Sequence, residues 1–255
     1  FSRQSHTAFF EKNYKHYRFQ GMQYTYLGYN LKHPIFRDKR VRQAIAYVIR
    51  TDELIQGVLM GRGRPVSGPF LPESWAVNPD VKPFPYDPAQ AKRLLAEAGW
   101  EDTDGDGILY RQGMKFSFTI LTNGENDQRK MTCEILQKEL SLVGIEVKIQ
   151  PMEWGTLLKE FIHPRRFDAV LMAWSLALDP DIYDLFHSSR TGPGQFNFIS
   201  YENKVVDRLL EDARKTFDQS KRAALYRQAH AIIYEDQPYS FLYAAESLSV
   251  IHLRF

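Results

Sequence analysis

The sequence contains a single cysteine, Cys133. An internal disulfide needs two cysteines, so a disulfide framework is excluded. Cys133 falls within a helical pattern, which predicts a small, buried, apolar side chain rather than a reactive thiol.

Long apolar runs are also missing. Ala169–Leu178 has no charged residue, proline or glycine, but it is far shorter than the roughly 20 residues that span a bilayer. Such a run is typical of a strand buried on both faces of a sheet. It contains Trp174 and Ser175, and an acidic proline loop with Asp179 follows, so the strand end points to an opening where ligands bind in helix-covered sheets. Trp174 either fills the core or forms a ligand wall.

Signatures of catalysis are absent. The sequence has no GxSxG, P-loop, GxGxxG or SxxK motif, and its seven histidines form no HExxH or other short-range zinc pair. Asp179 and Asp181 are the one obvious acidic pair near a strand end, so spacing alone leaves a two-carboxylate hydrolase open. We expect no enzyme activity, no cofactor and no metal site.

The charge distribution is uneven although the net charge is only +2. Residues 1–66 carry 12 Lys+Arg against 4 Asp+Glu, whereas the remaining 189 residues carry 21 against 27. A basic segment can bind nucleic acid, but here the charges are scattered among apolar positions, which favours a solvated face and no nucleic-acid partner. Phe1–Gln4 has neither an initiating Met nor an apolar signal segment, so we expect a processed or excised piece.

Apolar periodicity predicts alternating strands and helices. Between residues 115 and 174 the order is strand, helix, strand, short helix, strand, which implies an α/β fold with a mostly parallel sheet flanked by helices. Two more helices and two returning strands follow. The predicted strands cover 23–31, 115–121, 145–149, 169–174, 239–243 and 248–252, and the predicted helices cover about four turns after Asp38, then 88–99, 128–142, 155–162, 203–215 and 220–236.

Two segments lack a periodic pattern. Residues 61–88 are so rich in proline and glycine that we expect a long surface loop. Asp102–Gly107 (DTDGDG) matches the first half of a calcium loop, but its twelfth position is Gly113 instead of the expected Glu. It is either an Asp/Gly turn that leads into a strand or a weak calcium site.

Several ordered stretches together resemble one family. They are FRDKRVRQAIAYVIRTDELI, GPFLP with YDPAQAKRLLAEAGW, DTDGDGI, LQKELSLVGIEVKIQPMEW, FDAVLMAWSLALDPDIY and VVDRLLEDARKTFDQSKRAALYRQAHAIIYEDQPY. In this order and spacing they are similar to the extracytoplasmic solute-binding proteins of ABC importers, in the family of oligopeptide-, dipeptide- and nickel-binding proteins (family 5).

The resemblance implies a fold and a role. Family members are longer, and they enclose a ligand between two lobes. Residues 1–255 resemble the second, ligand-binding lobe alone, of the periplasmic-binding-protein type, so a first lobe is expected before Phe1. Peptide capture for import implies three partners: a peptide-like solute, ABC permease subunits and the missing N-terminal lobe. It also implies a bacterial periplasmic or cell-surface-anchored location. A nickel or metal-chelate binder of the same family is the alternative.

The resemblance also nominates site residues. Two tryptophans that line the family's cleft correspond to Trp154 and Trp174, and flat aromatic faces accept many side-chain shapes. Asn123, Asn126 and Gln128 fall in a turn where the family contacts ligand, although turn chemistry would also explain them.

The sequence departs from the oligopeptide-binding pattern beside the second tryptophan. Relatives can carry an Asp there that pairs with the peptide's α-ammonium, and an Arg shortly before it. Here the corresponding residues are Ser175–Leu178, and Leu171 stands where the Arg would be. Since a buried ammonium needs a partner, either Asp179 or the missing lobe supplies the charge, or the ligand is not a free peptide.

Overall fold

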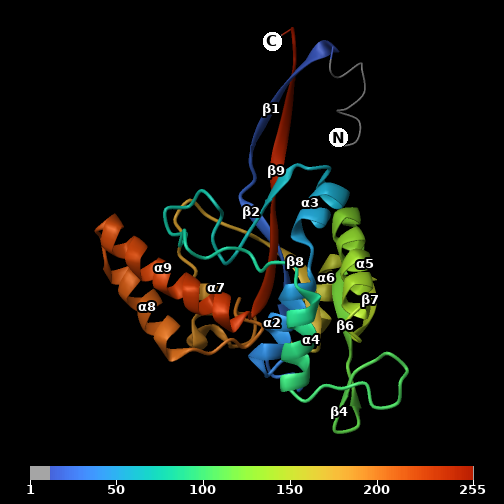
Figure 1. The fold of residues 1–255 in the computed structure, drawn as a ribbon. Coiled ribbons are helices and arrows are strands. Elements are labelled where there is room, and N and C mark those ends of the chain that lie inside the picture. The colour runs from blue at the N-terminus through green and yellow to red at the C-terminus, as the bar shows by residue number, and fades with distance from the viewer. Residues whose placement is uncertain (1–11, 255) are drawn as a thin grey trace.

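Seven strands form one mixed sheet with helices on both faces in the computed structural model (Figure 1). The structure describes residues 12–254, so residues 1–11 and 255 of the predicted lobe lie outside the described residues. The strand order is β1-β9-β2-β8-β6-β7, with β3 paired to β9, and β4 and β5 form a separate hairpin. The strands are β1 (Tyr14–Gln20), β2 (Gln23–Tyr29), β3 (Gly63–Pro65), β4 (Tyr110–Arg111), β5 (Met114–Lys115), β6 (Ser117–Asn123), β7 (Glu146–Met152), β8 (Ala169–Ser175) and β9 (Tyr239–His252). The helices are α2 (Lys39–Val48), α3 (Thr51–Leu59), α4 (Pro88–Glu97), α5 (Asp127–Ser141), α6 (Trp154–Thr156), η2 (Leu157–Ile162), α7 (Tyr183–Phe186), η3 (Ser188–Arg190), α8 (Lys204–Lys215) and α9 (Gln219–Asp236).

The parallel part of the sheet comes from the middle of the chain. β6 pairs in parallel with β7 and β8, as the strand–helix–strand order predicts. The remaining pairings of the large sheet are antiparallel: β1 with β9, β2 with β8, β2 with β9 and β3 with β9. The parallel pairings are thus confined to β6, β7 and β8, and the sheet is mixed. The two predicted returning strands are one continuous strand, β9, and β1 was not predicted because its exposed residues show no alternation.

Two hydrophobic cores lie on opposite faces of the sheet, and alternation along the strands creates them. In β8, Ala169 and Leu171 join the core under α2–α5, whereas Val170 and Met172 join the core under α7–α9. The two groups of helices flank the sheet in Figure 1. β8 is therefore buried on both faces, as its uninterrupted apolar run predicts.

The first predicted helix is two helices, α2 and α3. The backbone is extended at Ile49 (φ −87°, ψ 113°), although the apolar pattern continues through this point. The buried carboxylate of Glu139 on α5 accepts hydrogen bonds from the Arg50 backbone N–H (3.1 Å) and Nε (2.9 Å). Burial raises the pKa of Glu139, and the Arg50 hydrogen bonds oppose this rise. A partner 89 residues away thus stabilises the break.

Local capping explains the helices that were predicted well. The side chains of Asp87, Asn126, Asn203 and Asp218 accept backbone N–H hydrogen bonds at the starts of α4, α5, α8 and α9 respectively. A cap of this kind contributes roughly 1 kcal/mol. Each boundary is therefore encoded by residues within the helix's own first turn.

β1 and the outer half of β9 form a two-stranded ribbon that projects from the rest of the fold (Figure 1). Their register runs from Tyr14 opposite His252 to Gln20 opposite Glu246. At the base of the ribbon, Gly21 N–H donates to Ala245 O (3.1 Å), and a Cβ on Gly21 would lie only 2.6 Å from that oxygen. Glycine is therefore required where β1 joins the body of the sheet.

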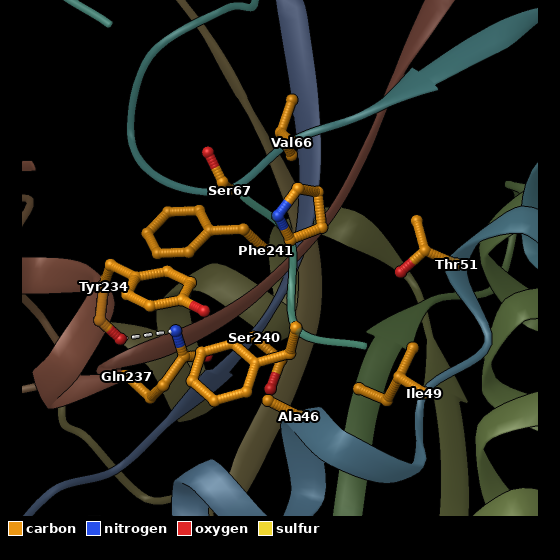
Figure 2. Close-up of a pocket in the computed structure, with 11 residues that line it drawn as sticks. Ala46, Ile49, Thr51, Val66, Ser67, Tyr234, Gln237, Ser240 and Phe241 are labelled. Atoms are coloured by element: carbon orange, nitrogen blue, oxygen red, sulfur yellow. Dashed lines mark hydrogen bonds between the residues drawn. The ribbon is translucent and has the colours of Figure 1, made fainter. Parts of the chain in front are cut away.

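Residues 61–88 contain the short strand β3 and otherwise lack regular structure, and part of this loop enters the core. Val66, Phe70, Leu71 and Ala76 are buried in the core under α7–α9. Figure 2 shows the contact between the loop and the base of β9, where Val66 and Ser67 lie near Phe241. The cavity left there is about 20 Å³, enough for one water molecule. The loop is packed, not merely laid over the surface.

Asp102–Gly107 forms a turn whose carboxylates bind its own backbone. Asp102 accepts from the N–H groups of Gly105 (2.8 Å) and Gly107 (3.1 Å), and Asp106 accepts from Ile108 N–H (2.7 Å). These bonds fit the predicted Asp/Gly turn before β4. One carboxylate oxygen from each of the exposed residues Asp102, Asp104 and Asp106 lies within 4.8 Å of the other two. The calcium alternative therefore stays a prediction.

One expectation about apolar residues, the burial of Cys133, is met. Cys133 is buried and free, and burial raises the pKa of its thiol to about 12. Over residues 12–254, none of the helices combines the length and hydrophobicity required to cross a bilayer.

We predict that Gly68→Ala weakens the attachment of the loop. The new Cβ would lie 2.2 Å from Nε2 of His230, a buried ring on α9 that has little room to move. Overpacking of this kind costs about 1–3 kcal/mol of unfolding free energy. Denaturant unfolding measures it, with Gly57→Ala in α3 as the control, where the nearest atom is 3.9 Å away and helix propensity favours alanine. Equal stability of the two variants would contradict the prediction.

We also predict that His230 makes the fold sensitive to acid. Its Nδ1 accepts from Asn78 N–H (3.0 Å), and burial lowers the pKa of His230 from 6.5 to about 4. Between pH 6.5 and 4, His230 therefore binds a proton in the unfolded chain but not in the folded chain. The free energy of unfolding falls by about 3 kcal/mol as the pH drops through this window. Unfolding at several pH values should show a shallower acid slope for His230→Gln. An unchanged slope would disprove the assignment.

Candidate functional site

The parallel strands end at one edge of the sheet. Because β6 runs parallel to β7 and β8, Asn123, Met152 and Ser175 all lie at this edge. β2 runs the other way, so it begins here, with Gln23 opposite Ser175. Crevices outside the carboxyl ends of strands are where ligands bind in sheets of this type.

A groove of about 650 Å³ opens beside the end of β8, and we call it the strand-end groove. Its walls come from the base of the ribbon, the 61–88 loop, the β8–α7 segment and Phe196, and they are mostly apolar. Its volume suits a small ligand. The lining residues are Gln20, Met22, Pro69, Phe70, Leu71, Glu73, Ser74, Trp75, Trp174, Ser175, Leu176, Ala177, Leu178, Asp179, Pro180, Asp181, Ile182, Asp184, Leu185 and Phe196.

Trp174 is half-buried and lines the groove. Its indole stacks on Tyr26 with ring centroids 6.1 Å apart and 10° between planes, and its Nε1 donates to the Tyr239 hydroxyl (3.3 Å). Phe196 meets it edge-on at 5.6 Å. The ring thus packs on the core and also borders the groove, and its role as a ligand wall stays a prediction.

Ser175 and Asp179 line the same groove with their polar groups engaged. The Ser175 hydroxyl accepts from Gln23 Nε2 (2.8 Å). Both carboxylate oxygens of Asp179 accept from Arg222 on α9, each at 2.7 Å. These hydrogen bonds from Arg222 lower the pKa of Asp179, so the carboxylate is charged but already paired.

Asn123, Asn126 and Gln128 are not among the groove's lining residues. Asn126 caps α5 by accepting from Arg129 N–H (3.0 Å), and Asn123 accepts from Arg129 Nη1 (2.6 Å). Gln128 is exposed in the first turn of α5. Turn chemistry accounts for the two asparagines, and their role in ligand binding stays a prediction.

Trp154 lies at the start of α6, just after β7, and is 39% exposed. The Gly124 N–H donates to Met152 O (2.7 Å), which joins this strand end to the Asn123 turn. Trp154 does not line the strand-end groove. The structure thus brings Trp174, Ser175 and Asp179 together and leaves Trp154 after the end of β7, which is separated from β8 by β6 at the same edge of the sheet.

Sequence reasoning missed three residues of this region. Trp75 and Phe196 line the groove, but both lie in irregular segments where no periodicity marks them. Arg222 lies in the first turn of the helix predicted over 220–236 and looks like an ordinary polar-face residue. The one signal for it in the sequence is the acidic loop at Asp179–Asp181, which contains no basic residue of its own.

Comparison with known proteins gives consistent results. The chain is 43% identical over 225 residues to the oligopeptide-binding protein AppA of Bacillus subtilis, covering 87% of this chain and 41% of that protein. It is 32% identical over 222 residues to the dipeptide-binding protein of Escherichia coli, covering 86% and 39% respectively. The chain therefore spans less than half the length of these relatives.

Solved structures are similar to the fold described above. AppA from Bacillus subtilis in complex with a nonapeptide has a TM-score of 0.88 at 40% identity, over 94% of this chain and 48% of that one. NikZ from Campylobacter jejuni in complex with Ni(L-His) has a TM-score of 0.86 at 27% identity, over 95% and 49%. The predicted fold class, an α/β lobe of the periplasmic-binding-protein type, is confirmed.

The family suggested by the sequence motifs is also confirmed. The model of the bacterial extracellular solute-binding proteins, family 5 middle region, matches residues 3–196. These residues include β8, Trp174 and all the lining residues of the strand-end groove. The chain belongs to family 5 of the bacterial extracellular solute-binding proteins.

Proposed function

We propose that this chain is one ligand-binding lobe of a protein that captures peptides for an ABC importer. The observation that carries the proposal is the strand-end groove, which places the half-buried Trp174 beside apolar walls at the carboxyl ends of the strands. The relatives named for oligopeptide and dipeptide binding, and the AppA complex with a nonapeptide, support peptide as the solute.

A second lobe completes the site in this proposal. The groove is open, and the chain spans less than half the length of its relatives. In this proposal residues 1–255 belong to a single lobe, and the projecting ribbon of β1 and β9 would connect it to the other lobe. Closure of two lobes around the ligand would then create the surface that ABC permease subunits bind.

The proposed role is binding and delivery, not catalysis, and its place is the periplasm or the outer cell surface. The family's description as extracellular solute-binding proteins supports both statements. Nucleic acid is not a proposed partner, since several basic residues of the N-terminal segment have structural roles. Arg42 is one of them: it is buried and donates to the carbonyls of Phe36 (2.5 Å) and Asp236 (2.5 Å).

A metal chelate is the alternative solute, and the similarity to NikZ in complex with Ni(L-His) favours testing it. Among residues 12–254, the cluster of three or more potential metal ligands is the Asp102 turn, which does not line the groove. The groove therefore offers a chelate single carboxylates rather than a cluster of metal ligands, as far as residues 12–254 are concerned. Peptide remains the preferred proposal.

Calorimetry of the complete protein tests the function. We expect heat and a thermal shift with peptides drawn from mixtures of two to nine residues, and at most weak binding by this lobe alone, because one lobe offers only part of the contacts. Ni²⁺ and Ni²⁺–histidine serve as the competing ligands. Binding of the chelate with no response to any peptide would overturn the peptide proposal.

We predict that Trp174→Ala weakens peptide binding by the complete protein about 30-fold, or roughly 2 kcal/mol, as expected for a central aromatic contact. The control is Phe217→Ala, which removes a fully exposed aromatic ring between α8 and α9 and should leave the dissociation constant unchanged. Trp154→Ala tests the second predicted cleft residue separately. If Trp174→Ala and wild type bound peptide with equal affinity, the groove would not be part of the peptide-binding site.

A further inference from the structure

The acidic side chains that line the strand-end groove are paired with arginines that do not line it. Its lining residues include four carboxylates and no lysine or arginine, as far as residues 12–254 are concerned. An uncompensated set of this kind would attract cationic ligands. The four acidic residues are Glu73, Asp179, Asp181 and Asp184.

Each of these carboxylates has an arginine partner that does not line the groove. Arg64 pairs with Glu73, and Arg214 Nε lies 2.7 Å from Asp181. Arg190 Nε lies 2.9 Å from Asp184 Oδ1, close enough for an ion pair but too poorly aligned for a hydrogen bond.

The pair between Asp179 and Arg222 has the most restrictive geometry. The guanidinium binds both carboxylate oxygens at 2.7 Å and also donates to the Tyr226 hydroxyl (2.9 Å). It lies over the rings of Trp75 (5.6 Å) and Tyr226 (5.2 Å). Bidentate pairing and aromatic stacking both favour arginine over lysine. Arg222 is thus held in place from several directions, with its side chain only 19% exposed.

The rest of the groove suits an uncharged peptide segment. Trp75, Trp174 and Phe196 provide aromatic surface, and Leu176 adds an aliphatic wall. The side-chain amide of Gln20 is buried at the groove, and neither its nitrogen nor its oxygen has a hydrogen-bond partner among the described residues. An amide can donate to and accept from a peptide backbone, which carries both kinds of group.

We propose that Arg222 is a specificity-determining residue: by occupying Asp179 it makes the strand-end groove a subsite for an uncharged, apolar side chain and excludes an ammonium group. This inference rests on the proposed peptide-binding function. It also assigns a role to the acidic residue after β8, which could have been the anchor of a peptide's α-ammonium. In this lobe an ammonium would have to compete for Asp179 with a bidentate, stacked guanidinium that already neutralises its charge, so we expect a ligand's positive charge to be met elsewhere.

A double-mutant cycle on the complete protein tests the inference. Calorimetry would compare peptides that bind the wild type with versions in which each position in turn is Leu, Lys or Glu, with free and acetylated N-termini. At the position that enters the groove, we expect wild type to prefer Leu over Lys by at least tenfold. Arg222→Met should reduce that preference at least tenfold by freeing Asp179. Asp179→Asn should instead favour Glu, since Arg222 is then unpaired.

The double variant Asp179→Asn with Arg222→Met should regain the wild-type preference for Leu within about threefold, because both charges are gone. This restoration also shows that the single variants act through charge and not through loss of folding. Arg93→Met is the matched control, since Arg93 pairs with Glu97 on the exposed face of α4. It should leave every preference unchanged.

The outcomes separate the two proposals. If the wild type binds peptides but prefers Lys in the groove, or if Arg222→Met leaves the Leu-to-Lys ratio unchanged, the role of Arg222 is wrong and peptide capture stands. A preference for Lys that appears only in Arg222→Met supports the proposed role of Arg222. If the wild type binds no peptide, both proposals fall.

Discussion

The hydrogen-bonded position of β8 between β2 and β6 is the constraint on which the rest of the structure depends. Its register is fixed on both sides, with Tyr24 opposite Trp174 and Leu121 opposite Val170. Because side chains alternate along a strand, Trp174 continues the row of Val170 and Met172 on the α7–α9 side, and Ser175 faces the other way. A slip of one residue would exchange these rows, bury a serine and expel the indole. The same pairing that builds both cores therefore orients the aromatic wall of the groove.

Much of the fold could be predicted from the sequence because its determinants are local. The caps of α4, α5, α8 and α9 immediately precede the helices they begin, and the apolar run of β8 marks a doubly buried strand. The break between α2 and α3 could not be predicted, because it depends on the buried carboxylate of Glu139 on another helix. The continuity of β9 was missed for a similar reason: β1, its partner in the ribbon, has no apolar alternation of its own.

In the candidate site too, some residues could be predicted from local sequence and others could not. Trp174, Ser175 and Asp179 follow one another along the chain at a strand end, so one local pattern identified all three, and all three line the groove. Trp75 and Phe196 reach it from irregular segments, and only the folded chain brings them there. The neutralisation of the groove's carboxylates depends on residues far from them in the sequence, namely arginines of α8, α9 and other segments. Sequence could therefore indicate where a ligand binds, whereas the kind of ligand depends on tertiary contacts.

The ribbon of β1 and β9 has a mechanical consequence. Both strands join the body of the sheet at one place, where Gly21 approaches Ala245 too closely for any side chain. A two-stranded ribbon twists and bends more easily than a sheet covered by helices on both faces. We therefore expect the lobe to turn relative to the ribbon at this neck, the junction of Gly21 and Ala245. Because Gln20 and Met22 on either side of Gly21 also line the groove, bending at this neck would move one wall of the groove relative to the others.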